Sequence, residues 1–191
     1  HNAAQKILSE IKSVASKNKD YQQLLKAFQY EIAITDTNQN FINPYSLINQ
    51  IENEIKKTSF PVNAVLQNYL AEVYTRIYGT NSNKTKDPKF ARFNSFGKSE
   101  YLKFIDSLFQ VSLKEEDKLK NIPSSEYTEI LFDKENINCY PSLYDILAHR
   151  LLKFYLNNEN EVNNEDLFLF ADSTYLMPHQ QFLKLKINDT P

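Results

Sequence analysis

The chain has 191 residues, of which 41% are hydrophobic, and its formal net charge is −2. This length is enough for one domain, or two small ones, whose core needs no disulfide. Acids and bases are mixed along the chain and only three bases are arginines, which argues against a nucleic-acid-binding face. The two glycines exclude a glycine-rich phosphate loop, a dinucleotide fingerprint and a nucleophile elbow. No apolar run approaches the roughly 20 residues of a membrane span.

The first 79 residues contain four segments with the apolar spacing of amphipathic helices. The first covers 3–16, and the second begins near Tyr21 and continues to Ile32. The third opens at Pro44, whose missing N–H costs nothing in a first helical turn, and the fourth runs from 59 to Gly79. Because only short breaks separate these segments, we expect two antiparallel hairpins that resemble tetratricopeptide (TPR) repeats.

The second half of the chain has a less regular pattern. Residues 80–96 form the longest polar interval, which we expect to be a mobile loop. A fifth helix then follows with Ser99 as its cap, and a short helix follows Pro123. The strongest helix signal begins at Ser142, which forms a capping-box variant with Asp145. Weaker apolar signals lie at 167–170 and 180–187.

These elements predict an all-α fold built from antiparallel helix hairpins. They are arranged either as a TPR-like right-handed array or as an irregular helical bundle, because the usual TPR consensus is missing. We expect a single helical domain over 1–191 that is a fragment of a longer chain. An alternative division places sub-units at 2–79 and 98–187, joined by the loop 80–97.

One constellation has the spacing of a catalytic site. Ser142, Asp145 and His149 follow one another at i, i+3 and i+7, so they share a helical face. A hydroxyl that caps its own helix is already occupied, however, and no oxyanion donors accompany it. We therefore expect a structural role, in which Asp145 orients a packed His149 imidazole. The sequence predicts no catalytic residue, no cofactor and no metal site, because zinc would need more ligands of suitable spacing.

Two other residue sets are candidates for a site. Glu72 stands out as an acid on an apolar helix face, and we expect it to pair with Arg76 one turn later. Five tyrosines lie on otherwise apolar helices: Tyr69, Tyr74, Tyr78, Tyr144 and Tyr155. They either line a groove for a peptide or glycan, or close the core between helix pairs. A glycan hydrolase would also need two acids facing each other across a cleft.

The most specific sequence of the chain is YPSLYDILAHR at 140–150. It resembles the N-terminal helical region of bacteroidete alpha-2-macroglobulin-like proteins, which are very large cell-envelope protease inhibitors. Three further segments resemble that region in the same order: LAEVY at 70–74 with Tyr78, SLK at 112–114 with 122–123 and Tyr127, and FLKL at 182–185. The thioester motif of such inhibitors is not present at Cys139, which is followed by Tyr-Pro-Ser.

The resemblance implies a non-catalytic helical scaffold or interaction module, located in the periplasm or at the cell surface. Its expected partners are the downstream domains of the same parent chain and another envelope protein, with no nucleic acid and no membrane span in this segment. The alternative is a stand-alone TPR-like module that binds an extended peptide or an envelope partner. An enzyme is not expected.

Overall fold

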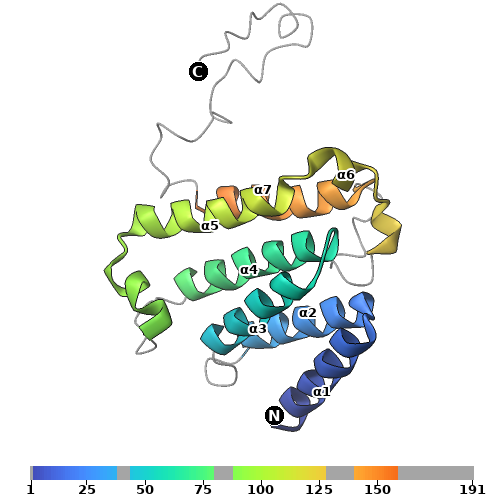
Figure 1. The fold of residues 1–191 in the computed structure, drawn as a ribbon. Helices are drawn as coiled ribbons and strands as arrows, with labels where there is room; N and C mark the ends of the chain where they lie inside the picture. Colours follow the sequence, from blue (N-terminus) through green and yellow to red (C-terminus); the bar gives the residue numbers. More distant parts are fainter. Residues whose placement is uncertain (1, 38–43, 80–87, 128–139, 159–191) are drawn as a thin grey trace, which may run out of the picture.

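The computed structural model describes residues 2–37, 44–79, 88–127 and 140–158. These residues form α1 (Asn2–Asn18), α2 (Tyr21–Thr37), α3 (Pro44–Lys57), α4 (Val62–Gly79), η1 (Pro88–Ser95), α5 (Lys98–Leu113), α6 (Glu116–Lys120), η2 (Ser124–Glu126) and α7 (Leu143–Asn157). No strand occurs in the described ranges, and one isolated bridge joins Pro123 to Ser142. The predicted all-α fold is confirmed, with the helices packed in a bundle-like arrangement (Figure 1).

The first four helices form two hairpins, since α1 packs against α2 and α3 packs against α4. The turn between α1 and α2 is tight because Lys19 adopts a left-handed backbone conformation, with φ of 57°. The amide of Asp20 donates to the carbonyl of Ala15 at 2.9 Å, and the amide of Lys19 donates to the carbonyl of Ser16 at 3.3 Å. These two bonds satisfy the last carbonyls of α1 and reverse the chain direction.

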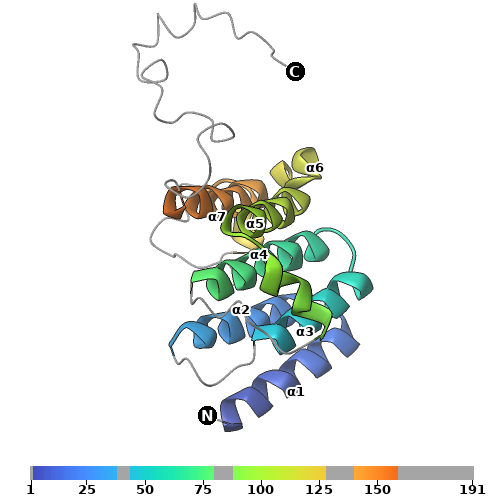
Figure 2. The same cartoon turned by 90° about the vertical axis from the view of Figure 1, so that its left-hand side faces the viewer.

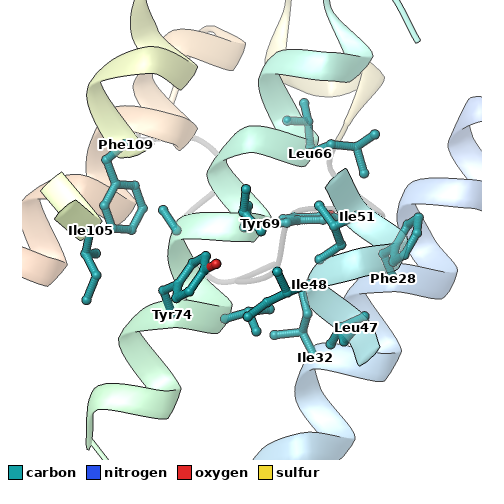
Figure 3. Packing of buried hydrophobic residues seen from close by; sticks show 14 of the residues in the cluster. Phe28, Ile32, Leu47, Ile48, Ile51, Leu66, Tyr69, Tyr74, Ile105 and Phe109 are labelled. Atoms are coloured by element: carbon teal, nitrogen blue, oxygen red, sulfur yellow. The ribbon is translucent and has the colours of Figure 1, made fainter. Parts of the chain in front are cut away.

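Helix α4 is the centre of the fold, because it packs against α2, α3, α5 and α7. Figure 1 and Figure 2 both place α1 at one end of the molecule and α5 with α7 at the other. The buried side chains form one hydrophobic cluster that runs through all of these layers. Figure 3 shows part of it, with Tyr69 and Tyr74 among aliphatic residues of the neighbouring helices. A single core therefore joins the described parts of the two sub-units considered above.

The prediction of a loop throughout 80–96 is wrong for its second half, where η1 spans Pro88–Ser95. Phe90 and Phe93 of η1 are buried in the core. The ring centroid of Phe93 lies 5.4 Å from that of Tyr74 and 5.0 Å from that of Phe104. Aromatic residues three apart lie on one side of a 3-10 helix, so a mainly polar segment can still be anchored by one face.

Two elements in the second half of the chain, α5 and η2, differ in detail from the elements that the sequence predicts. Helix α5 begins at Lys98 with Gly97 as its N-cap, so Ser99 is not the cap. The side chain of Glu100 instead reaches back to accept the amide of Gly97 at 2.9 Å. Of the short helix predicted after Pro123, a single 3-10 turn, η2, is present at Ser124–Glu126. Residues 130–132, which also contributed to that prediction, lie outside the described residues. The signals at 167–170 and 180–187 lie outside the described residues.

Candidate functional site

The start of α7 shows why Ser142 and Asp145 do not act as a nucleophile and its partner. Ser142 is the buried N-cap residue of α7, and its Oγ accepts the amide of Asp145 at 3.4 Å. The Asp145 carboxylate in turn accepts the Ser142 amide at 2.9 Å and the Ser142 hydroxyl at 2.6 Å. The predicted capping box is therefore confirmed, and the pair is occupied in satisfying the free N–H groups of the helix.

The expected pairing of Asp145 with His149 is wrong. His149 is exposed, and its ring centroid lies 4.8 Å from that of Tyr140. No hydrogen bond joins Asp145 to His149 in the part of the chain that the structure describes. The physical reason is orientation, because the Asp145 carboxylate points back toward Ser142, whose amide and hydroxyl both donate to its Oδ2. The imidazole therefore packs against an aromatic ring instead of a carboxylate.

The groove alternative for the tyrosines is also wrong for the two residues at its centre. Tyr69 and Tyr74 are buried in the hydrophobic cluster, and their rings pack between helices rather than facing an opening (Figure 3). Tyr78, Tyr144 and Tyr155 are partly buried and pack against the same cluster. Helical periodicity alone could not distinguish a groove from a core here, since both require an apolar face.

Glu72 lies in a polar group that joins α4 to α7. Its Oε1 lies 2.7 Å from Nη2 of Arg76, which confirms the predicted ion pair within α4. Its Oε2 lies 3.1 Å from Nη1 of Arg150, which comes from α7. One carboxylate therefore joins two guanidinium groups and ties α4 to α7. The sequence did not indicate Arg150 for this role, because the two helices meet only in the folded chain.

Further contacts extend this group into the core. The guanidinium carbon of Arg150 lies 5.1 Å from the ring centroid of Tyr69, and its Nη1 lies 3.4 Å from Oδ1 of Asn68. Asn68 is fully buried, and its Nδ2 donates to Oγ of Ser112 at 3.1 Å and to the carbonyl of Leu147 at 3.3 Å. We call Asn68, Tyr69, Glu72, Arg76 and Arg150 the α4–α7 polar cluster.

The electrostatics of the α4–α7 polar cluster favour binding and positioning over proton transfer. Burial, and next the nearby Arg150, lower the pKa of Arg76 from its ordinary value. Burial raises the pKa of Tyr69 despite the opposing effect of Arg150, so its hydroxyl stays protonated. That hydroxyl donates to Oε1 of the buried Gln29 at 3.4 Å, which links the cluster to α2.

A second polar network lies at the other end of the molecule and was not predicted. The buried Lys12 of α1 pairs with the carboxylate of Glu31 on α2 and donates to Oε1 of Gln50 on α3. Its Nζ also lies 4.8 Å from the ring centroid of Phe28. Because a buried ammonium needs partners, these contacts determine how α1 sits against α2 and α3.

The described residues contain no group of three or more histidine, cysteine, aspartate or glutamate side chains placed to hold a metal ion. None of the helices that the structure describes has the length and apolar character needed to cross a membrane. Comparison with protein-family models, curated proteins and solved structures finds no match for this chain.

Proposed function

We propose that this chain is a non-catalytic helical scaffold that holds the downstream domains of an alpha-2-macroglobulin-like protease inhibitor in the cell envelope. The observation that carries the scaffold role is the central position of α4, which packs against helices from both halves of the described fold. The inhibitor context, with its periplasmic or cell-surface location, rests on the ordered four-segment resemblance of the sequence.

A scaffold must keep one arrangement of its helices while it holds the domains attached to it. In this fold the helix packing is supplemented by polar contacts with directional requirements, at Lys12 in the first hairpin and at Glu72 between α4 and α7. Apolar packing tolerates small shifts between helices, whereas an ion pair that joins two helices is broken when either helix moves. These two networks therefore favour a fixed spacing between the ends of the module.

The scaffold role can be tested in the parent inhibitor. Replacing the module by a flexible glycine–serine linker of equal length should reduce protease trapping or displace the inhibitor from the envelope, because such a linker samples many end-to-end distances. A parent carrying Val111→Gln, a change at an exposed position of α5, is the matched control and should behave as wild type. Normal trapping and normal envelope placement with the linker would contradict the proposal.

A second candidate is a stand-alone module that binds an extended peptide. The α4–α7 polar cluster favours it, because Arg76 and Arg150 are partly exposed and bring two guanidinium groups to one seam. An acidic peptide should then bind the purified chain more tightly than a neutral peptide of the same length. Arg150→Met should abolish that difference, as measured by fluorescence anisotropy. Equal affinity for both peptides would dismiss this candidate.

A further inference from the structure

Helix α1 presents a continuous row of aliphatic side chains to solvent. Ile7, Ile11 and Val14 are 55%, 38% and 59% exposed. Their spacing of four and then three residues places them on one face of the helix. We call these three residues the α1 stripe. The stripe cannot turn inward, because Leu8 and Lys12 are already buried against the neighbouring helices.

A lysine stands near each end of the α1 stripe. Lys6 directly precedes Ile7, Lys17 follows Val14 by three residues, and both lysines are exposed. They lie in line along one edge of the stripe, roughly 16 Å apart along the helix axis, because their separation is close to three whole helical turns. Glu10 is an exposed acid between them and offsets one of the two charges, so this edge remains net positive. We call Lys6 and Lys17 the flanking lysines.

The α1 stripe differs from the other large apolar residues that are exposed in the described chain. Those are Tyr30 on α2, Val111 on α5 and Leu156 on α7. Single exposed apolar residues are normal on soluble domains, whereas a contiguous group with a charged rim indicates an interaction surface. A partner for this surface should offer an apolar run with a carboxylate at each end.

The chain itself contains a segment of that chemistry. Residues 159–172 include no lysine or arginine, and they carry the apolar run Leu-Phe-Leu-Phe at 167–170. Glu165 and Asp166 directly precede this run, and Asp172 follows it by two residues. We propose that residues 159–172 of a second copy of this chain bind across α1, with their apolar side chains on the α1 stripe and their carboxylates against the flanking lysines.

The lengths of the two patterns agree. An extended chain from Asp166 to Asp172 spans up to about 20 Å, and the flanking lysines lie roughly 16 Å apart along α1. Lysine side chains are long and flexible, so they can cover the remaining few ångströms. The distance between the acids that bound the apolar run therefore matches the distance between the lysines that bound the α1 stripe.

A second copy is favoured over the same chain because of distance. The segment follows Asn158 at the end of α7, and α7 lies at the opposite end of the molecule from α1 (Figures 1 and 2). The path from α1 through α2 and α4 to α7 crosses three helix packings, or roughly 24–30 Å at the usual interaxial spacing. Fully extended, residues 159–166 span at most about 28 Å, which barely matches this straight path through the core. The segment would have to follow a longer route around the outside of the helices.

The contact joins two different surfaces, so its symmetry has consequences. If two copies exchange their segments reciprocally, the association closes as a dimer. If each copy instead donates to the next, open chains form. Either assembly requires only the α1 stripe, the flanking lysines and the acidic segment, and it is independent of whether the chain spaces inhibitor domains.

The experiment is sedimentation velocity of the full 191-residue chain from micromolar to millimolar concentration. We expect concentration-dependent association that is weakened at least about tenfold by Ile7→Gln, Ile11→Gln and Val14→Gln together, since central apolar contacts dominate such interfaces. Glutamine at residues 167–170 should weaken it equally. Mixing these two variants should restore one segment–stripe contact and hence measurable association, because one variant retains the segment and the other retains the stripe.

Charge exchange provides a separate check of the same contact. Lys6→Glu with Lys17→Glu, and Asp166→Lys with Asp172→Lys, should each weaken association, and a mixture of the two should regain it. Glu10→Gln should strengthen association, because it removes the one carboxylate that opposes the acidic segment on this edge.

Two positions far from α1 provide matched controls for the apolar substitutions. Val111→Gln on α5 and Leu156→Gln on α7 replace side chains that are 56% and 60% exposed, which is close to the exposure of Ile7 and Val14. Neither change should affect association.

Three results would overturn the proposal. The first is a chain that stays monomeric throughout the concentration range, whether or not hydrogen exchange shows α1 protected by its own segment. The second is association that survives the substitutions at 167–170 but is lost with those on α1, which would mean that two α1 stripes pair directly. The third is failure of the mixed variants to associate.

Discussion

The ammonium group of Lys12 and the carboxylate of Glu31 form an ion pair whose side chains are only 7% and 8% exposed. Lys12→Met should lower the free energy of unfolding by about 3–5 kcal/mol, because it removes one partner of a buried ion pair. Urea unfolding followed by circular dichroism measures this change.

The matched double variant separates the ion pair from the packing around it. Lys12→Met with Glu31→Leu should be far less destabilised than Lys12→Met alone, since an apolar pair of similar volume carries no buried charge. A double variant that loses as much stability as the single one would show that the pairing of charges is not what matters at this position.

Removing the charge of Glu72 should destabilise the junction of α4 with α7. Glu72→Gln leaves Arg76 and Arg150 close together without the carboxylate between them, and we expect a loss of about 1–3 kcal/mol in unfolding free energy. Adding Arg76→Met should recover part of this loss by removing one of the two like charges. Added salt should reduce the penalty of the single variant, and a penalty that grows with salt would argue against charge repulsion as its cause.

Tyr74 and Tyr30 provide a comparison between a core tyrosine and a surface tyrosine. The ring centroid of Tyr74 lies 5.4 Å from that of Phe93 and 5.0 Å from that of Phe104, edge-on to the latter. Tyr74→Ala should cost about 3–5 kcal/mol in thermal or urea unfolding, whereas Tyr30→Ala at an exposed position should cost less than about 1 kcal/mol. Near-equal costs would place Tyr74 outside the core.

A substitution at Lys19, in the turn after α1, should stabilise the fold. Lys19 has φ of 57°, which lies in the left-handed region. There the Cβ atom of a side chain crowds the backbone, and glycine has no Cβ atom. Lys19→Gly should therefore raise the unfolding free energy by about 1 kcal/mol. Glu10→Gly, at an exposed position in the middle of α1, is the control and should lower it by about 0.5–1 kcal/mol. A decrease at both positions would be inconsistent with the left-handed turn.

The fold should lose stability in alkaline solution, in part through Tyr155. Burial, and next its hydrogen bond to the Asp106 carboxylate, raise the pKa of Tyr155 from 10.0 to about 12. Because the folded pKa is the higher one, the stabilisation is complete below pH 10 and is lost as the pH rises through about 12. Tyr155→Phe should flatten the dependence of unfolding free energy on pH in this window.

Tyrosinate absorbance during a pH titration gives a second measurement. If the Tyr155→Phe protein titrated with the same midpoints as wild type, the raised pKa would not belong to Tyr155.

Contacts between residues within one helical turn could be predicted from the sequence. The Ser142–Asp145 capping box and the Glu72–Arg76 ion pair join residues three and four apart, and helix geometry brings such residues together in any surrounding fold. The same geometry suggested a pair between Asp145 and His149. That pair is wrong because the Asp145 carboxylate points back to Ser142 and the His149 ring packs on Tyr140, a choice of partner that spacing alone does not determine.

Contacts between distant helices could not be predicted in this way. Arg150 reaches Glu72, and Lys12 reaches Glu31 and Gln50, only because α7 and α1 pack where they do. Phe90 and Phe93 lie in a mainly polar segment, and their burial depends on the space left beside α4 and α5. No local pattern carries this information.

By itself, the sequence determined that this protein is helical, where most of its helices lie and which residues one turn apart meet, because these properties follow from backbone periodicity and local hydrogen bonding. Only the tertiary structure decided that Tyr69 and Tyr74 close the core, that Glu72 binds two arginines and that the α1 stripe faces solvent. The physical reason is that burial depends on which helix faces pack together. An amphipathic pattern marks an apolar face without naming the surface that covers it.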